Sequence, residues 1–128
     1  MAASLPKTGL RPPPPRAVRL GGPQEAAALV DAWPYLDVRT PEEFKAGHVD
    51  GAINVPFMFS TPAGMAPNPT FLEDVKSKLQ PGGPVIVGCK SGRRSAAASA
   101  VLADHYGDIL DVDGGYDAWV SAGLPVVM

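Results

Sequence analysis

The 128-residue sequence has little cysteine and little histidine: one Cys, Cys89, and two His, His48 and His105. A single cysteine excludes an internal disulfide, so nothing in the composition argues for an oxidising compartment. These three dispersed residues also lack the spacing of a zinc site. We therefore expect no bound metal and no other cofactor.

The sequence also lacks a surplus of basic residues and a long apolar run. Its formal net charge is −2 and its pI is about 5.6, which excludes the broad positive face that nucleic acid binding requires. No apolar run approaches the roughly 20 residues that cross a bilayer. We therefore expect a soluble protein that binds neither nucleic acid nor a membrane.

Acidic side chains are absent from residues 1–24, which hold four basic residues and six of the 15 prolines. This composition predicts a disordered, Pro-rich basic tail over residues 1–16. The tail is either an organellar transit segment or a plain polyproline extension. We expect one domain over residues 17–128, located in the cytoplasm or, with a transit segment, in chloroplasts or mitochondria.

What the sequence does contain is enough apolar residues, 45%, to form a core, and they occur in alternating patterns. Strands are predicted over residues 17–20, 35–38, 52–55, 85–87 and 109–112. Helices are predicted from Pro23 to Trp33, over residues 40–46, 69–79 and 94–106, and from Gly114 past Trp119. Strands that alternate with helices predict an α/β fold of three layers, with a central, mostly parallel sheet of about five strands and helices on both faces.

Between these elements, residues 47–51 are predicted to be a turn and residues 57–69 a loop. The segment 57–69 contains three prolines and a glycine, a composition that argues against regular secondary structure. The apolar side chains of this segment either lie over a site or pack on the edge of the core. Thr40 and Glu43 have the spacing of a capping box that starts the helix at Pro41.

Cys89 lies where the apolar strand 85–87 is predicted to turn into the Ala-rich helix. Backbone amides of such a loop, and of the first helical turn, converge on one point and carry partial positive charge. Lys90, Arg93 and Arg94 add cationic charge. Both effects favour the thiolate and predict a pKa of Cys89 below its usual value of about 8.5. The alternative is that Cys89 is simply a small buried apolar residue.

Another predicted strand, 35–38, ends in a pair of charged residues, Asp37 and Arg39. In open parallel sheets, ligands bind outside the carboxyl ends of the strands. Because Cys89 also follows a strand end, we expect all three residues at one edge of the sheet.

Several stretches, taken in order, resemble the single-domain rhodaneses, or thiosulfate sulfurtransferases, of the small plant type. They are YLDVRTPEEF at 35–44, GHVDGAINVP at 47–56, CKSGRRS at 89–95, and GGY at 114–116 with Trp119 and GLP at 123–125. Each stretch alone is weakly specific, whereas the ordered set is strongly so. The resemblance spans nearly all of residues 17–128 and leaves the Pro-rich tail without a counterpart.

The resemblance implies an enzyme that moves the sulfane sulfur of thiosulfate, or of a related donor, through a Cys89 persulfide. This is covalent catalysis in two half-reactions. Because the chain has no second cysteine to resolve the persulfide, the acceptor must be external: cyanide, a small thiol, or a protein thiol such as a thioredoxin-like partner. We expect the enzyme to be a monomer.

The resemblance also assigns roles to individual residues. Cys89 is the expected nucleophile. The residues expected to bind the donor are Lys90, Ser91, Gly92, Arg93, Arg94 and Ser95. Asp37 and Arg39 are expected to brace the loop, or else to form a strand-end salt bridge with only a stabilising role.

Three other functions compete with a thiosulfate sulfurtransferase. A phosphatase or arsenate reductase would have five residues between cysteine and arginine, whereas four separate Cys89 from Arg94, and Gly88 stands where phosphatases carry histidine. A non-catalytic binding module is disfavoured because such modules commonly lack the cysteine. A sulfur carrier or regulatory module that binds a partner protein remains the alternative.

Overall fold

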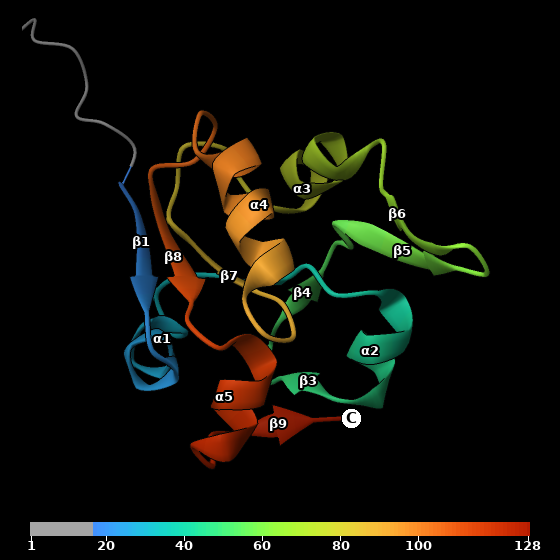
Figure 1. Cartoon of the computed structure of the whole chain (residues 1–128). Helices are drawn as coiled ribbons and strands as arrows, with labels where there is room; N and C mark the ends of the chain where they lie inside the picture. Colours follow the sequence, from blue (N-terminus) through green and yellow to red (C-terminus); the bar gives the residue numbers. More distant parts are fainter. Residues whose placement is uncertain (1–16) are drawn as a thin grey trace, which may run out of the picture.

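A five-stranded sheet runs through the centre of the computed structural model, which describes residues 17–128 (Figure 1). The strands lie in the order β1 (Ala17–Gly21), β8 (Asp108–Val112), β7 (Val85–Gly88), β2 (Tyr35–Asp37) and β4 (Ile53–Asn54). Every neighbouring pair is parallel, which confirms the predicted α/β class. The expected tail, residues 1–16, lies outside the described residues.

Helices cover both faces of this sheet. The helices α3 (Phe71–Lys78) and α4 (Arg93–Leu102) share one buried cluster with strand residues, and α1 (Pro23–Leu29) and α5 (Gly115–Ser121) share a second cluster on the opposite face. The short helix α2 (Pro41–Ala46) follows β2 and lies beside the carboxyl end of the sheet (Figure 1). The fold is therefore the predicted three-layer arrangement.

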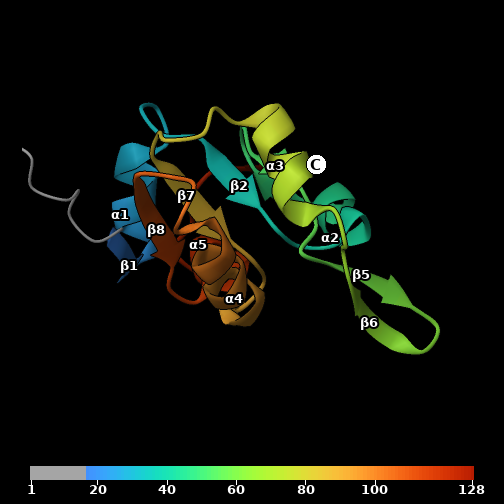
Figure 2. The ribbon, with the colours of Figure 1, turned by 90° about the horizontal axis from the view of Figure 1, so that it is seen from above.

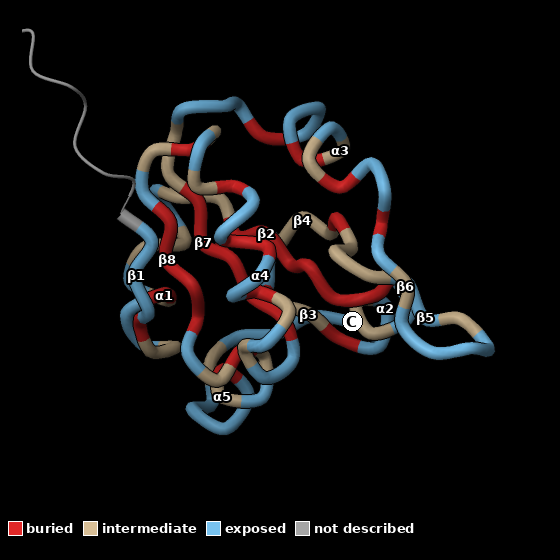
Figure 3. The backbone as a smooth tube through the Cα atoms, turned by 45° about the horizontal axis from the view of Figure 1, so that its top comes forward, coloured by how far each residue is buried: buried red, intermediate tan, exposed pale blue. Residues whose placement is uncertain are grey.

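The strand sequences explain why both faces are covered. In β7, Val85 and Val87 belong to the α3–α4 cluster, whereas Ile86 between them belongs to the α1–α5 cluster. Alternate strand residues point to opposite faces, so a strand buried on both sides is a continuous apolar run. Figure 3 shows the result, with the central strands buried along their length and the helix surfaces exposed.

The predicted loop at residues 57–69 is wrong, because the structure forms a β-hairpin there. The strands β5 (Met58–Thr61) and β6 (Gly64–Pro67) pair antiparallel and project from the body of the molecule (Figure 2). Gly64 takes a φ of +115° in the tight connection, and Pro67 lies at the strand's last position, where a missing amide is tolerated. The prolines therefore delimit the hairpin instead of preventing it.

The apolar side chains of residues 57–69 do not share one environment. Phe57 packs on the α3–α4 cluster, with its ring 5.1 Å from that of Phe71. Phe59 and Met65, farther out on the hairpin, are exposed. Phe57 thus seals the edge of the core, and the hairpin tip contributes nothing to it.

Other element boundaries also differ from the predictions. The helix predicted to reach residue 106 ends at Leu102, although Tyr106 remains buried and donates its hydroxyl to the Leu79 carbonyl at 2.9 Å. The predicted turn at 47–51 contains β3 (His48–Val49), which pairs with β9 (Val126–Val127). The β3–β9 pairing brings the end of the chain back to the α1–α5 face, a contact that no local pattern signals.

Candidate active site

The loop between β7 and α4 places Cys89 at the carboxyl end of the central strand. The residue is only 1% exposed. The amide N–H of Gly92 donates to the Cys89 sulfur at 3.0 Å, and the Ser95 hydroxyl lies 3.5 Å from the same sulfur. The loop and the first turn of α4 therefore meet at this sulfur.

The start of α5 holds this loop in place. The amides of Tyr116 and Asp117 donate to the carbonyls of Cys89 and Lys90 at 2.8 and 3.0 Å. Gly115 permits the approach, because a Cβ on it would lie 2.5 Å from the Cys89 carbonyl oxygen and its φ is +58°. Because the carbonyls of Cys89 and Lys90 point toward α5, they are directed away from the Cys89 sulfur.

The basic side chains predicted to bind the donor are mostly engaged elsewhere. Lys90 forms a solvent-exposed ion pair with Asp117 at 2.9 Å. Arg94 binds Glu43 of α2 through two hydrogen bonds of 2.7 and 3.0 Å. Ser91 and Arg93 are exposed at the mouth of the loop, and Arg93 makes no ion pair within residues 17–128.

Glu43 performs two structural tasks that the sequence pattern only half revealed. Its backbone and carboxylate complete the capping box with Thr40, as predicted, at 3.0 to 3.2 Å. The same carboxylate binds Arg94, which lowers the pKa of Glu43 to about 2, with further help from the hydrogen bonds of Thr40 and against the opposing effect of burial. The pKa of Arg94 is correspondingly raised. Glu43 thus ties α2 to the head of α4.

Asp37 and Arg39 lie at the same edge of the sheet, as expected, but they bind each other. Arg39 donates from its amide, Nε and Nη2 to the Asp37 carboxylate at 2.7 to 3.1 Å, and Nη2 also donates to the Gly47 carbonyl at 2.7 Å. Both side chains are buried. The Arg39 guanidinium lies 4.1 Å from the centre of the Tyr116 ring. Because the Tyr116 amide binds the Cys89 carbonyl, the Asp37–Arg39 pair contacts the loop indirectly, through Tyr116.

The sequence reasoning did not select Asp111, which the structure places beside Cys89. Asp111 is buried in β8, with an oxygen 2.6 Å from the Ser95 hydroxyl. Burial raises the pKa of its carboxyl group, against the lowering effect of the Ser95 hydrogen bond. The available signal was one acidic residue inside the apolar strand Ile109–Leu110–Asp111–Val112, on the face opposite Leu110.

Gly88, directly before Cys89, bears on the phosphatase alternative. A Cβ at this position would lie 2.8 Å from Cζ of the buried Tyr35 ring, so the fold has no room for a larger residue there. The histidine that phosphatases carry before their cysteine would fit here only if the buried Tyr35 ring moved. The structure therefore adds a steric argument to the count of residues in the loop.

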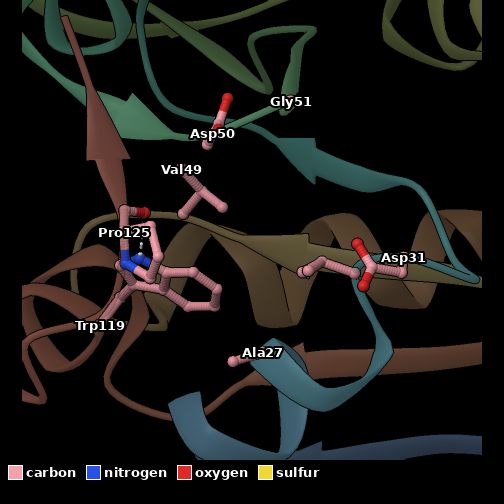
Figure 4. A pocket seen from close by; sticks show the side chains of 8 residues that line it. Ala27, Asp31, Val49, Asp50, Gly51, Trp119 and Pro125 are labelled. Carbon is pink, nitrogen blue, oxygen red and sulfur yellow. Dashed lines mark hydrogen bonds between the residues drawn. The ribbon is translucent and has the colours of Figure 1, made fainter.

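The described residues form several surface hollows, two of which differ in their distance from Cys89. One, of about 230 Å³, lies beside the loop and is lined by Arg39, Glu43, Ala46, Gly47, Lys90, Tyr116 and Asp117. The other, of about 410 Å³, lies between α1, the β3–β4 turn and the C-terminal segment, away from Cys89 (Figure 4). In Figure 4 the Trp119 indole donates to the Pro125 carbonyl at 2.9 Å beneath this second hollow.

The described part of the chain contains no cluster of three or more His, Cys, Asp or Glu side chains that could hold a metal ion. Within residues 17–128, no helix has the length and apolar character needed to cross a membrane.

The sequence matches the family described as the rhodanese-like domain over residues 22–122. The chain belongs to the rhodanese family. The match covers the Cys89 loop, its α5 support and the Asp37–Arg39 pair, whereas β1 lies ahead of it. The family match therefore includes the edge of the sheet at which these groups lie.

Among the curated rhodanese relatives, two from Arabidopsis thaliana are especially similar. Thiosulfate sulfurtransferase 16, chloroplastic, is 51% identical over 92 residues, which cover 71% of this chain and 77% of the relative. Thiosulfate sulfurtransferase 18 is 43% identical over 106 residues, covering 80% and 78%. These relatives support a transferase that acts on sulfur.

Solved structures agree with the fold. A rhodanese-related protein from Thermoplasma volcanium superposes with a TM-score of 0.62 at 27% identity, covering 85% of this chain and 97% of that chain. The rhodanese fold that the sequence resemblance implied is therefore confirmed.

Proposed function

We propose that this rhodanese is a thiosulfate sulfurtransferase that carries sulfane sulfur as a Cys89 persulfide. The observation that carries the proposal is that the Cys89 sulfur accepts a hydrogen bond of 3.0 Å from the Gly92 amide at the start of α4. Relatives named thiosulfate sulfurtransferases support thiosulfate, or a related sulfane donor, as the substrate.

The reaction balances in two steps. The Cys89 thiolate attacks the outer sulfur of thiosulfate, a sulfur–sulfur bond forms to the enzyme, and sulfite leaves with the electron pair of the bond that breaks. The persulfide anion then gives its terminal sulfur to cyanide or to an external thiolate, and the Cys89 thiolate is regenerated. Each step transfers one sulfur atom and needs no added oxidant or reductant.

The chain supplies the electrostatics for these anions. The Gly92 amide and the first turn of α4 place partial positive charge at the sulfur, where burial keeps water out. Arg93 and Lys90 at the mouth attract the dianionic donor. Arg94, fixed by Glu43, contributes its charge from a set position and holds the loop's shape.

The test is intact mass measurement after incubation with thiosulfate. The wild-type protein should gain one sulfur atom, and cyanide should remove it. The Cys89→Ser variant should gain none, because no other cysteine exists. A wild-type protein without the adduct, or a Cys89→Ser variant that retains it, contradicts the mechanism. Hydrolysis of a phosphate ester by the wild type would instead favour the phosphatase.

The physiological acceptor separates this enzyme from a sulfur carrier. If a thioredoxin-like protein discharges the persulfide much faster than cyanide or a small thiol does, the chain acts as a carrier. The names of chloroplastic and mitochondrial relatives support an organellar location for this chain, for which residues 1–16 are the candidate transit segment.

A further inference from the structure

Behind the reactive sulfur, a short chain of polar groups leads into the core. The Cys89 sulfur is 3.5 Å from the Ser95 hydroxyl oxygen, and that oxygen is 2.6 Å from an Asp111 carboxylate oxygen. All three residues are buried, at 1%, 0% and 5% exposure. They come from three separate elements: the loop, α4 and β8.

The distances indicate which way the hydrogens point in the resting protein. Ser95 has one hydroxyl hydrogen and two nearby acceptors, Asp111 at 2.6 Å and the Gly92 carbonyl at 3.2 Å. The shorter contact is typical of a hydroxyl that donates to a carboxylate. With that hydrogen committed to Asp111, the Ser95 oxygen is free to accept the Cys89 S–H.

We propose that Asp111 takes up the proton of the Cys89 thiol through Ser95 and holds it while the sulfur is anionic. The S–H bond breaks with its electron pair left on sulfur, and the proton joins the Ser95 oxygen. In the same step the Ser95 hydroxyl proton passes to Asp111. The product is a thiolate that accepts from Ser95, with a neutral Asp111 that donates to Ser95.

This transfer solves a charge problem in the buried site. A thiolate and an ionised Asp111 together would place two negative charges within a few ångströms in a region that water hardly reaches. Moving one proton keeps the charge at −1 through the thiolate and, on the proposed function, through the persulfide anion too. The proton returns to sulfur when the cycle ends.

The charges around Asp111 favour a proton on it. Burial raises the pKa of its carboxyl group; the Ser95 hydrogen bond opposes this, and the negative charge of Asp113 at the end of the strand adds to the rise. On the other side of β7, the Tyr35 hydroxyl of β2 stays protonated because burial and nearby carboxylates raise its pKa. From α4, only the neutral Ser95 hydroxyl binds Asp111, and no ion pair to Asp111 exists within residues 17–128.

This role makes Asp111 a positioning residue, and its effect has a direction that simple repulsion would reverse. If Asp111 remained ionised, replacing it by Asn would remove a repelling charge and increase the thiolate fraction. If Asp111 takes the proton, its neutral carboxyl group donates to Ser95, and Ser95 donates to the thiolate; the same replacement puts a weaker amide donor there and decreases the thiolate fraction at mildly acidic pH. The two readings therefore predict opposite signs for one variant.

The experiment follows the ultraviolet absorbance of the thiolate against pH, with Cys89→Ser subtracted as the blank. Because Cys89 is the only cysteine, the difference reports this thiol alone. Asp111→Asn and Ser95→Ala should each lower the thiolate fraction at mildly acidic pH by about tenfold, equivalent to about one pKa unit. Their rates of persulfide formation should fall in parallel.

Matched controls lie on the same elements. Ser99→Ala removes a buried hydroxyl one turn along α4 that has no hydrogen-bond partner within the described residues, and Asp108→Asn removes an exposed carboxylate at the far end of β8. Both should titrate as the wild type does. A thiolate fraction that rises or stays unchanged in folded Asp111→Asn overturns the proposal. If Asp111→Asn does not fold, an unchanged thiolate fraction in Ser95→Ala does so instead.

These readouts separate the inference from the function on which its reaction cycle rests. A wild-type thiolate that depends on Asp111, in a protein that forms no persulfide, would leave the proton transfer standing and refute the sulfurtransferase. Persulfide formation with a thiolate indifferent to Asp111 would do the reverse.

Discussion

Gly115, beside the Cys89 loop, is constrained by the path of the backbone and not by the chemistry of a side chain. Gly115 lies where the start of α5 meets the carbonyls of Cys89 and Lys90. Its φ of +58° and the missing Cβ are both required there. The glycine therefore supports the candidate active site although it offers no functional group.

We predict that Gly115→Ala displaces the loop and abolishes persulfide formation. The added Cβ would lie 2.5 Å from the Cys89 carbonyl oxygen, so the loop or α5 must move. The expected cost is about 2–4 kcal/mol of the free energy of unfolding, from the clash added to backbone strain. Thermal and urea unfolding measure the cost, and the thiosulfate mass assay measures the activity.

Gly123→Ala is the matched control for this change. Gly123 has a similar φ of +74°, but nothing lies within 4 Å of a Cβ built on it. It should lose only about 1 kcal/mol, from the left-handed backbone alone, and keep full activity. Equal losses in the two variants would show that contact with the Cys89 carbonyl is unimportant.

At the scale of elements, the link between α2 and α4 positions the start of α4, the helix that follows Cys89. The Glu43–Arg94 pair joins residues 51 positions apart and is mostly shielded from solvent, with side chains 27% and 16% exposed. A half-buried, bidentate pair of this kind contributes more than an exposed one. The pair holds α2 against the head of α4.

We predict that Glu43→Gln lowers stability at neutral pH by about 1–3 kcal/mol, because it leaves Arg94 without its carboxylate. The folded pKa of about 2 lies below the ordinary value of 4.5, so the wild type gains this stability above about pH 4.5 and loses it as pH falls toward 2. The variant should show a flatter decline over that range. Unfolding in urea at a series of pH values provides the measurement.

The control is Glu42→Gln, in the same turn of α2. Glu42 is exposed and makes no side-chain hydrogen bond within the described residues, so Glu42→Gln should lose at most the helix-dipole contribution of about 0.3–1 kcal/mol and keep an acid profile close to that of the wild type. If Glu43→Gln followed the wild-type acid profile as Glu42→Gln does, the Arg94 pair would not stabilise the fold.

For the whole molecule, the question is where the domain begins. The family match starts at residue 22, whereas the sheet includes β1 as its edge strand beside β8. Gly21 of β1 accepts a hydrogen bond from the Asp113 amide at 2.7 Å, next to the α5 start that supports the loop. We therefore propose that the domain includes β1 and begins at residue 17, ahead of the family match.

We predict that a chain starting at residue 17 unfolds at the same temperature as the full chain and forms the persulfide equally well. A chain starting at residue 22 should unfold several degrees lower, because β8 loses β1, one of its two neighbouring strands, along five residues and becomes an edge strand. Equal stability of the two shortened chains would move the boundary to residue 22. Reduced stability of the longer one would assign part of the domain to residues 1–16.

Local pattern was sufficient for much of this molecule. The alternation of apolar strands and helices, the capping box at Thr40 and the position of Cys89 between a strand and a helix all follow from interactions within a few residues. Such interactions can be predicted from a sequence because the interacting residues are close together along the chain. The family resemblance added the expected chemistry of the loop, and the family match confirmed the membership.

Only the tertiary structure decided which groups meet across distant segments. Thr40 and Glu43 predicted a helix start, but the pairing of Glu43 with Arg94 depends on how α2 packs beside α4. Asp111 was one acid in an apolar strand until β8 placed it behind Ser95. The pairing of β3 with β9 likewise joins segments that lie far apart in the sequence. These contacts arise from packing, and packing is a property of the whole chain rather than of any stretch of it.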